Sequence, residues 1–298
     1  MSDLRPLDVP ITVHFEKSFH FGTGQREGLI NRTVRRSASG APYVPASALK
    51  GALRQTAERF VRTLDGLLRK GEEVPDEWRL GMRRRGTQKT SEMCTAPQPA
   101  DMCQSASPCL VCRVFGNTYS GRRLIVDDAY LDGSSPETKS LREAFRSVEE
   151  GNPEEEGNVI RRERPERIGQ TETVTRLQMD RRRKGAQHGA LFTTEYARGQ
   201  APFRGRLSGQ VPLTPLEDGS PAELVLLAAT LRSTDQIGGE ASTGRGACSV
   251  RVESIEEGAG DGAGPPEPVL QAGDDTYHMD DLLEKKVLEN LAWSEMDM

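Results

Sequence analysis

The sequence predicts an α+β fold, and three observations support this class. Residues 9–21 begin with apolar side chains at alternating positions, a pattern typical of a half-buried strand. Residues 47–69 repeat apolar side chains at helical spacing, and the run 222–231 (AELVLLAATL) is typical of a second, core helix. Strand-like segments precede and follow each helix. The order strand, helix, strand, strand, helix, strand fits a ferredoxin-like βαββαβ core that carries insertions.

The start of the first helix is marked by the proline-bounded run 42–54 (PYVPASALKGALR). Ser47 is a good N-cap, and Lys50 and Arg54 then lie four residues apart on one helical face. Backbone N–H groups at a helix start are free to bind anions, and residues 28–57 contain no Asp or Glu. The run therefore predicts a phosphate site, although an ordinary capped surface helix has the same signals.

The later elements follow from alternation and turn residues. We expect a core domain over residues 1–255, with a polar insertion at about 70–115 and a hairpin at about 160–190. A Gly- and Pro-rich linker at 256–272 leads to an acidic helix or tail at 273–298. The remaining strands are expected at 124–131, 172–179, 189–198, 203–213 and 247–255.

Charge is distributed unevenly along the 298 residues. Residues 253–298 contain thirteen acids and two lysines, a local charge of −11, so the total of −5 leaves +6 on residues 1–252. A basic body suggests a polyanion partner, and the acidic tail either avoids that partner, contacts a protein or is simply solvated. No apolar stretch approaches the ~20 residues of a membrane span, and no signal peptide is evident at the N-terminus, so we expect a soluble, cytoplasmic protein.

Four of the five cysteines are closely spaced, in the pattern Cys94-x8-Cys103-x5-Cys109-x2-Cys112. Four thiolates can fill the tetrahedral shell of one Zn²⁺ and leave no position for water, so the pattern predicts a structural zinc site. Disulfides are the weaker explanation in a cytosolic chain, and chance clustering is the other alternative. Cys248 lies in an expected strand and is expected to be a small buried side chain.

Two further segments could contact phosphates. Nine basic residues lie between Arg161 and Lys184, and the run 181–184 looks like the tip of a hairpin, although a solvated charge run would look the same. The loop Gly238–Gly246 would let backbone N–H groups approach a phosphate, with side-chain donors beside them. That loop matches neither a Walker A sequence nor a Rossmann fingerprint, so it is a weak signal alone. Its side-chain donors are Ser242, Thr243 and Arg245.

Enzyme signatures are few. The four histidines are scattered, and no serine-nucleophile motif is present. His20 lies beside the first glycine loop and Asn31, whereas the pair Asp127–Asp128 could bind a metal but more simply ends a strand. Three aromatic residues could stack on bases, although core positions suit them better: Phe115, Tyr119 and Phe192.

Taken together, five ordered blocks of the chain resemble the RAMP superfamily of CRISPR RNA-binding proteins, and within it the repeated backbone subunit of type III effector complexes. The resemblance covers residues 9–255. The blocks are Pro42–Arg54, Val114–Asn117 after the Cys-x-x-Cys knuckle, Val126–Ala129, Thr175–Arg181 with Gly185–Ala186 and Leu191–Phe192, and Gly238–Gly246.

This resemblance implies an RRM-like palm and a hairpin thumb. Copies would stack along a CRISPR guide RNA together with other RAMP subunits, and the thumbs would wedge into the duplex with complementary target RNA. Recognition would be mainly of backbone and shape. The residues implied for RNA binding are His20, Ser47, Lys50, Arg54, Arg176, Arg181, Gly238, Gly239, Ser242 and Arg245.

The sequence departs from the family at one position. Family members that cut target RNA carry an Asp where this chain has Asn31, and an amide is a poor substitute for a carboxylate base or metal ligand. We therefore expect a subunit that binds RNA without cutting it. Three alternatives stay open: a substitution at this position, Glu27 acting instead in a Mg²⁺-dependent endoribonuclease, or a zinc-stabilised RNA-binding protein unrelated to defence.

Overall fold

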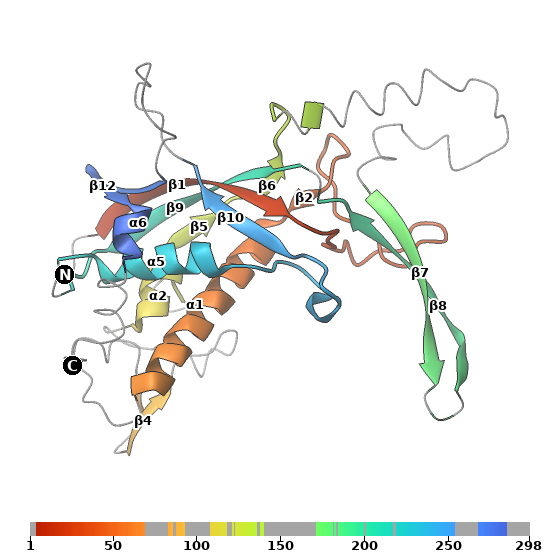
Figure 1. Ribbon diagram of the computed structural model, residues 1–298, viewed down its shortest axis with the longest axis horizontal. Coiled ribbons are helices and arrows are strands. Elements are labelled where there is room, and N and C mark those ends of the chain that lie inside the picture. Colours follow the sequence, from red (N-terminus) through yellow and green to blue (C-terminus); the bar gives the residue numbers. More distant parts are fainter. Residues whose placement is uncertain are drawn as a thin grey trace.

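A computed structural model gives the structure of much of the chain (Figure 1). The residues it describes are 4–68, 83–85, 88–92, 108–117, 121, 123–135, 138–139, 171–180, 182, 184–199, 201–216, 219–253 and 268–284. Several residues predicted to be functional lie outside this part: Cys94, Cys103, Tyr119 and Arg181. Among the described helices, none combines the length and the apolar character that a membrane span needs.

The body of the molecule is built on an antiparallel sheet of eight strands in the described residues. Strands β1 (Leu4–Phe15) and β9 (Phe203–Pro212) pair along almost their whole length at its centre. Two strands share the outer edge of β1, namely β10 (Cys248–Val252) and β11 (Val269–Ala272). On the other side, β9 pairs with β5 (Leu124–Val126) and β6 (Ala129–Leu131). The two remaining strands lie at the ends of the sheet: β2 (Tyr43–Val44) pairs with β6, and β12 (Asp275–His278) pairs with β11.

Helices cover one face of this sheet (Figure 1). They are α1 (Ala46–Leu68), α2 (Leu110–Phe115) and α5 (Ala222–Ser233), with the short α6 (Met279–Leu282) packed on α5. Alternate residues of β1, such as Val9 and Ile11, point into the core and are fully buried. The order β10–β1–β9–β5/β6, with α1 and α5 as the connecting helices, is the βαββαβ arrangement that the sequence predicted.

Helix α5 lies in the middle of the core, and every residue from Ala222 to Leu231 is buried. Its first turn contains a buried acid, Glu223, which forms an ion pair with Arg113 of α2. Thr214 donates its backbone N–H to Glu223 at 2.8 Å. Burial lowers the pKa of Arg113 to about 10, because the charged guanidinium loses solvent. The predicted core helix is therefore confirmed, and it includes one buried charge pair.

The start of α1 differs from the sequence expectation. The helix begins at Ala46, so Ser47 lies in the first turn with an exposed side chain. The cap comes from the loop between β5 and β6: the backbone N–H of Ala46 donates to Asp128 Oδ1 at 2.6 Å. Asp128 follows the neighbouring strand in space and not in sequence, so no local motif could reveal it. A carboxylate thus already occupies the helix start where a phosphate was expected.

A second sheet projects from the body as a hairpin (Figure 1). Strands β7 (Thr171–Asp180) and β8 (Gly185–Ala197) pair along their length, with a register shift between Leu177 and Met179. Its outer part exposes apolar side chains, and Leu177 and Leu191 face each other across the two strands. A further short ladder joins β3 (Arg83–Arg85) and β4 (Gln88–Glu92) within the predicted insertion.

Three parts of the chain were predicted less well. The expected strand 124–131 is interrupted at Asp127 and Asp128, where the chain leaves β5 and enters β6. The short helix α2 was not expected within the polar insertion. Residues 269–278, predicted to be linker and tail, form β11 and β12 and extend the sheet.

Candidate nucleic-acid interface

The segment between β1 and α1 runs beside the base of the hairpin (Figure 1). Phe19 and Ala197 exchange backbone hydrogen bonds of 2.9 and 2.8 Å. Further along, Asn31 N–H donates to the Thr193 carbonyl at 2.8 Å, and Asn31 Oδ1 accepts from Thr193 N–H at 2.8 Å. Asn31, which the resemblance aligns with the Asp of family members that cut RNA, is therefore fixed against β8 by its side-chain oxygen.

The late glycine loop packs on the same segment. Gly246 N–H donates to the Ser18 carbonyl at 3.1 Å, and Gly246 has a φ of +73°. Gly238, with a φ of +103°, lies so close to Phe21 that a Cβ would be 3.1 Å from its ring. These positive φ angles and close approaches need glycine. The loop also contacts the hairpin, because its residue Glu240 accepts hydrogen bonds from Arg176 of β7 and Tyr196 of β8.

Three arginines meet at this junction and form, with Tyr196 and Glu240, what we call the arginine cluster. Arg245 stacks on the Tyr196 ring, 3.6 Å from its centroid, and Arg176 lies 5.6 Å from the same ring. Arg176 Nη1 and the Tyr196 hydroxyl each donate to Glu240 Oε2 at 2.8 Å. Arg32 and Arg245 lie 4.0 and 3.8 Å from the Glu240 carboxylate. Residues distant in sequence therefore share one charged site.

Burial and charge tune the titrating groups of the arginine cluster. Burial disfavours the Glu240 anion, but hydrogen bonds from Tyr196 and Arg176, with the charges of Arg176 and Arg245, outweigh it and lower the pKa of that carboxyl. Burial, and then the hydrogen bond to Glu240, raise the pKa of the Tyr196 hydroxyl. At neutral pH the site thus holds a carboxylate and a protonated phenol.

His20 lies at the edge of the arginine cluster. Its Nδ1 is 2.7 Å from the Glu195 carbonyl oxygen, and its ring meets Tyr196 edge-on at 5.8 Å.

The Glu195 side chain accepts a hydrogen bond of 2.9 Å from the backbone N–H of Val34 and forms an ion pair with Arg36. The positive charge of Arg36 is therefore already paired with a carboxylate of the protein.

Lys50 and Arg54 do not join the arginine cluster. Lys50 Nζ donates to the carbonyl oxygen of Leu124, the first residue of β5. Arg54 donates to the Gly116 carbonyl at 2.8 Å and to Glu58 at 3.0 Å. Both cations connect α1 to neighbouring segments. The RNA-binding role of Ser47, Lys50 and Arg54 stays a prediction, whereas their contacts give Lys50 and Arg54 a structural role.

The described half of the cysteine pattern lies around α2. Cys109 is the residue before the helix and Cys112 lies within it, and both are buried. Arg54 Nη2 lies 3.6 Å from Cys112 Sγ, so a cation faces one thiol. No group of three or more metal-binding side chains occurs in the described residues, and the other two cysteines lie outside them. The guanidinium beside Cys112 would favour the thiolate form of that side chain, which is the form that binds metals.

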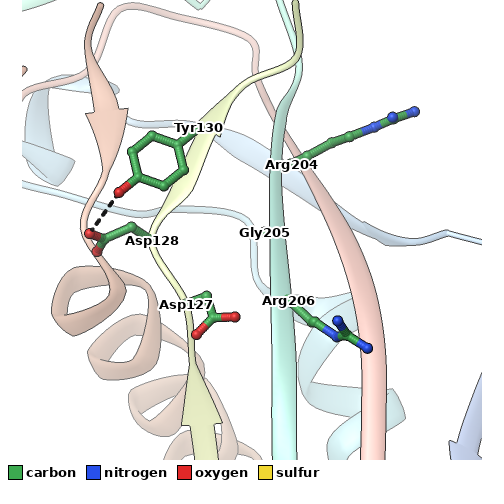
Figure 2. Close-up of a pocket in the computed structure, with 6 residues that line it drawn as sticks. All are labelled: Asp127, Asp128, Tyr130, Arg204, Gly205 and Arg206. Carbon is green, nitrogen blue, oxygen red and sulfur yellow. Dashed lines mark hydrogen bonds between the residues drawn. The ribbon is translucent and has the colours of Figure 1, made fainter. Parts of the chain in front are cut away.

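The sheet face without helices has a shallow pocket of about 480 Å³ (Figure 2). Figure 2 shows the side chains of Arg204 and Arg206 directed away from Asp127 and Asp128. Both arginines are paired elsewhere, Arg206 with Asp8 and Arg204 with Asp132 and Glu253. Asp128 serves as the cap of α1. Both arginines of this face are thus already paired with carboxylates of the protein.

Sequence reasoning missed three of the five residues of the arginine cluster. Arg32, Tyr196 and Glu240 have no motif of their own, although Arg32 follows Asn31, Tyr196 lies in the expected strand 189–198 and Glu240 lies within the glycine loop. Their association depends on the pairing of β8 with residues 19–36, which is a long-range contact. Phe115 is buried in the core, as preferred, and the Phe192 ring lies 6.0 Å from the Arg32 guanidinium.

The fold and this site define an α+β protein with an antiparallel sheet and a cationic junction beneath a projecting hairpin. A sequence profile of the RAMP superfamily matches residues 12–249, so the chain belongs to this superfamily. No curated protein sequence matches it significantly.

Solved structures with a similar chain include two type III-B Cmr-beta complexes. A chain of the complex bound to cognate target RNA has 17% identity and a TM-score of 0.45, covering 82% of this chain and 96% of its own. A chain of the apo complex has 15% identity and a TM-score of 0.43, covering 84% and 98%.

Proposed function

We propose that this protein is a guide-RNA-binding backbone subunit of a type III CRISPR effector complex. Membership of the RAMP superfamily supports this assignment. The observation that carries it is the arginine cluster, where the glycine loop, the Asn31 segment and the hairpin base meet. Guanidinium groups form paired hydrogen bonds with phosphates, so this junction suits the backbone of an RNA strand.

Binding at the arginine cluster would not depend on base sequence. Its donors are guanidinium groups and a phenol, which suit phosphates and not particular base edges. A subunit that must accept any guide needs this kind of recognition. His20 and the backbone of Gly238 and Gly239 line the same junction and would complete the contact with the strand.

The hairpin would act as the thumb that enters the guide–target duplex. Its tip carries exposed Arg182 and Lys184, which can contact phosphates. Leu177 and Leu191 are 51% and 67% exposed, which is high for large apolar side chains on a paired strand. We infer that these side chains rest against unstacked bases when RNA is bound.

The subunit would bind RNA without cutting it. The Asn31 side chain accepts a hydrogen bond from the Thr193 backbone N–H through its Oδ1. Its amide group can make this contact, but it cannot act as a base as a carboxylate would. The alternative is a Mg²⁺-dependent endoribonuclease that cuts target RNA at regular intervals. Incubating the assembled complex with complementary RNA and Mg²⁺ separates the two, because evenly spaced products that persist in Asn31→Ala would contradict a silent subunit.

A structural zinc ion would stabilise the insertion. Cys94, Cys103, Cys109 and Cys112 would hold it, and Arg54 would donate a hydrogen bond to the Cys112 thiolate. Four sulfur ligands close the coordination shell, so the ion would supply folding energy and no catalysis. Elemental analysis should find about one zinc per chain in purified protein.

RNA binding is best tested on the arginine cluster itself. We expect Arg245→Ala with Arg176→Ala to weaken binding of single-stranded RNA and to reduce the slope of log K against log salt by about 0.7 per lost phosphate contact. Arg206→Ala on the open sheet face is the matched control. Equal slopes for the cluster double variant and the wild type would refute the proposed site. Sequencing of copurified RNA would test the guide identity.

A further inference from the structure

Glu240 is an unexpected residue for the centre of an RNA-binding site. It lies in the glycine loop, where its backbone adopts a left-handed conformation with φ 63° and ψ 31°. Such a conformation is unfavourable for a residue with a side chain. Its carboxylate nevertheless accepts two hydrogen bonds and lies within 4.0 Å of two further guanidinium groups. The fold therefore directs an anion into the place where a phosphate would bind.

The charges explain why an anion is needed there in the free protein. Arg176 and Arg245 have side chains that are 31% and 17% exposed, and both lie against the Tyr196 ring. Two partly buried cations on one ring repel each other, and water screens them incompletely. Glu172 contacts Arg245 at 3.3 Å but contacts neither of the other arginines in the described interactions. Glu240 is the group that joins all three.

We propose that Glu240 is an internal stand-in for an RNA phosphate, holding the three arginines in place until a phosphate of the bound strand displaces its carboxylate. The inference rests on the RNA-binding function proposed above and concerns the same site. A phosphate oxygen accepts the same donors, so Arg176 and the Tyr196 hydroxyl can transfer their hydrogen bonds to it without moving far. The cluster is thus preorganised for its ligand.

The loop is suited to releasing the carboxylate. Gly238 and Gly239 precede Glu240, and apart from its two chain neighbours no residue lies within 4 Å of a Cβ added to Gly239. The Glu240 carbonyl accepts hydrogen bonds from the Thr243 backbone N–H at 3.0 Å and hydroxyl at 2.8 Å, which hold the backbone turn. Rotation about the side-chain bonds of Glu240 can therefore move its carboxylate away from the arginines while the backbone turn stays formed.

Glu240→Gln is the decisive variant because it removes the charge and retains an oxygen for the Tyr196 hydrogen bond. We expect this variant to bind an unstructured single-stranded RNA of about 20 nucleotides more tightly than the wild type. At low salt the gain should be about fivefold, the effect of one charge a few ångströms from a phosphate in a water-like medium. The salt slope should steepen by about 0.7. Asp127→Asn, on the open sheet face, makes the same change in net charge and should leave affinity unchanged.

The opposite result has a clear meaning. Unchanged or weaker binding by a folded Glu240→Gln variant, checked by its circular dichroism and Tm, would show that Glu240 only positions the arginines and would overturn the stand-in. An equal gain in Asp127→Asn would also overturn it, because the effect would then come from net charge alone. Arg245→Ala separates the two proposals: if it binds RNA as well as the wild type, the RNA site itself is wrong.

Discussion

The capping of α1 by a distant carboxylate leads to a stability prediction that can be worked from the structure. Asp128→Ala removes a hydrogen bond of 2.6 Å from the backbone N–H of Ala46, together with a negative charge at the positive end of a helix that runs to Leu68. The cap contributes about 0.5–2 kcal/mol, and the charge adds about 0.3–1 kcal/mol. We expect a loss of about 1–3 kcal/mol in the free energy of unfolding.

Urea denaturation followed by circular dichroism measures this loss. Asp127→Ala is the matched control, because Asp127 is adjacent, exposed and makes no capping contact. Ser47→Ala tests the motif-based expectation and should change stability by less than about 0.5 kcal/mol, as for an exposed surface residue. The reasoning fails if Asp128→Ala is no less stable than Asp127→Ala, or if Ser47→Ala is the most destabilised of the three.

Four further outcomes follow from buried or strained groups. Glu223→Ala should lower the free energy of unfolding by about 3–5 kcal/mol, because its buried guanidinium partner is left unpaired; a loss below that of an exposed Glu→Ala change would contradict this. Gly246→Ala should cost about 2 kcal/mol, since a Cβ there would lie 2.2 Å from a carbonyl oxygen, whereas Gly40→Ala shares the positive φ in open space and should cost less. Burial raises the pKa of the Cys248 thiol to about 12, so native protein at pH 8 should not be alkylated there, as mass spectrometry can check. The pKa of Glu240 is lowered, so its ionised carboxylate stabilises the fold at neutral pH, and this stabilisation is lost as the pH falls through the range below 4.5. Glu240→Gln should therefore lose less stability than the wild type in acid titrations.

Local signals in the sequence predicted the core well. The apolar spacing of residues 47–69 predicted α1 to within one residue at each end, and the run 222–231 predicted α5. The first prediction depends on the helical spacing of apolar side chains and the second on an almost unbroken apolar run, and both signals are set by burial along a single element. The strand expected at 124–131 was too long because Asp127 and Asp128 interrupt it, and the reason, the capping of α1, is a contact between distant segments.

The candidate site was predicted in part for the same reason. The glycine loop and Arg245 could be recognised by composition, and Arg176 by the family resemblance. Glu240 could not be recognised as a partner of Arg32 and Arg176, because only the packing of the loop beside β8 brings them together. Lys50 and Arg54 were expected to face a ligand, yet both side chains donate hydrogen bonds to backbone carbonyls of neighbouring segments. A basic residue in a sequence does not reveal whether the fold itself needs its donors.

The pairing of the central strands has a consequence for synthesis on the ribosome. Strand β1 is made first, but its partner β9 ends at Pro212, and the strands on its other side lie at 248–252 and 269–272. The hydrogen-bonding edges of β1 must therefore wait for most of the polypeptide to emerge. Such high contact order slows folding and leaves an apolar strand open to association with other nascent chains. Truncation before residue 269 would leave part of that edge permanently uncovered, so we expect shortened versions to aggregate during expression.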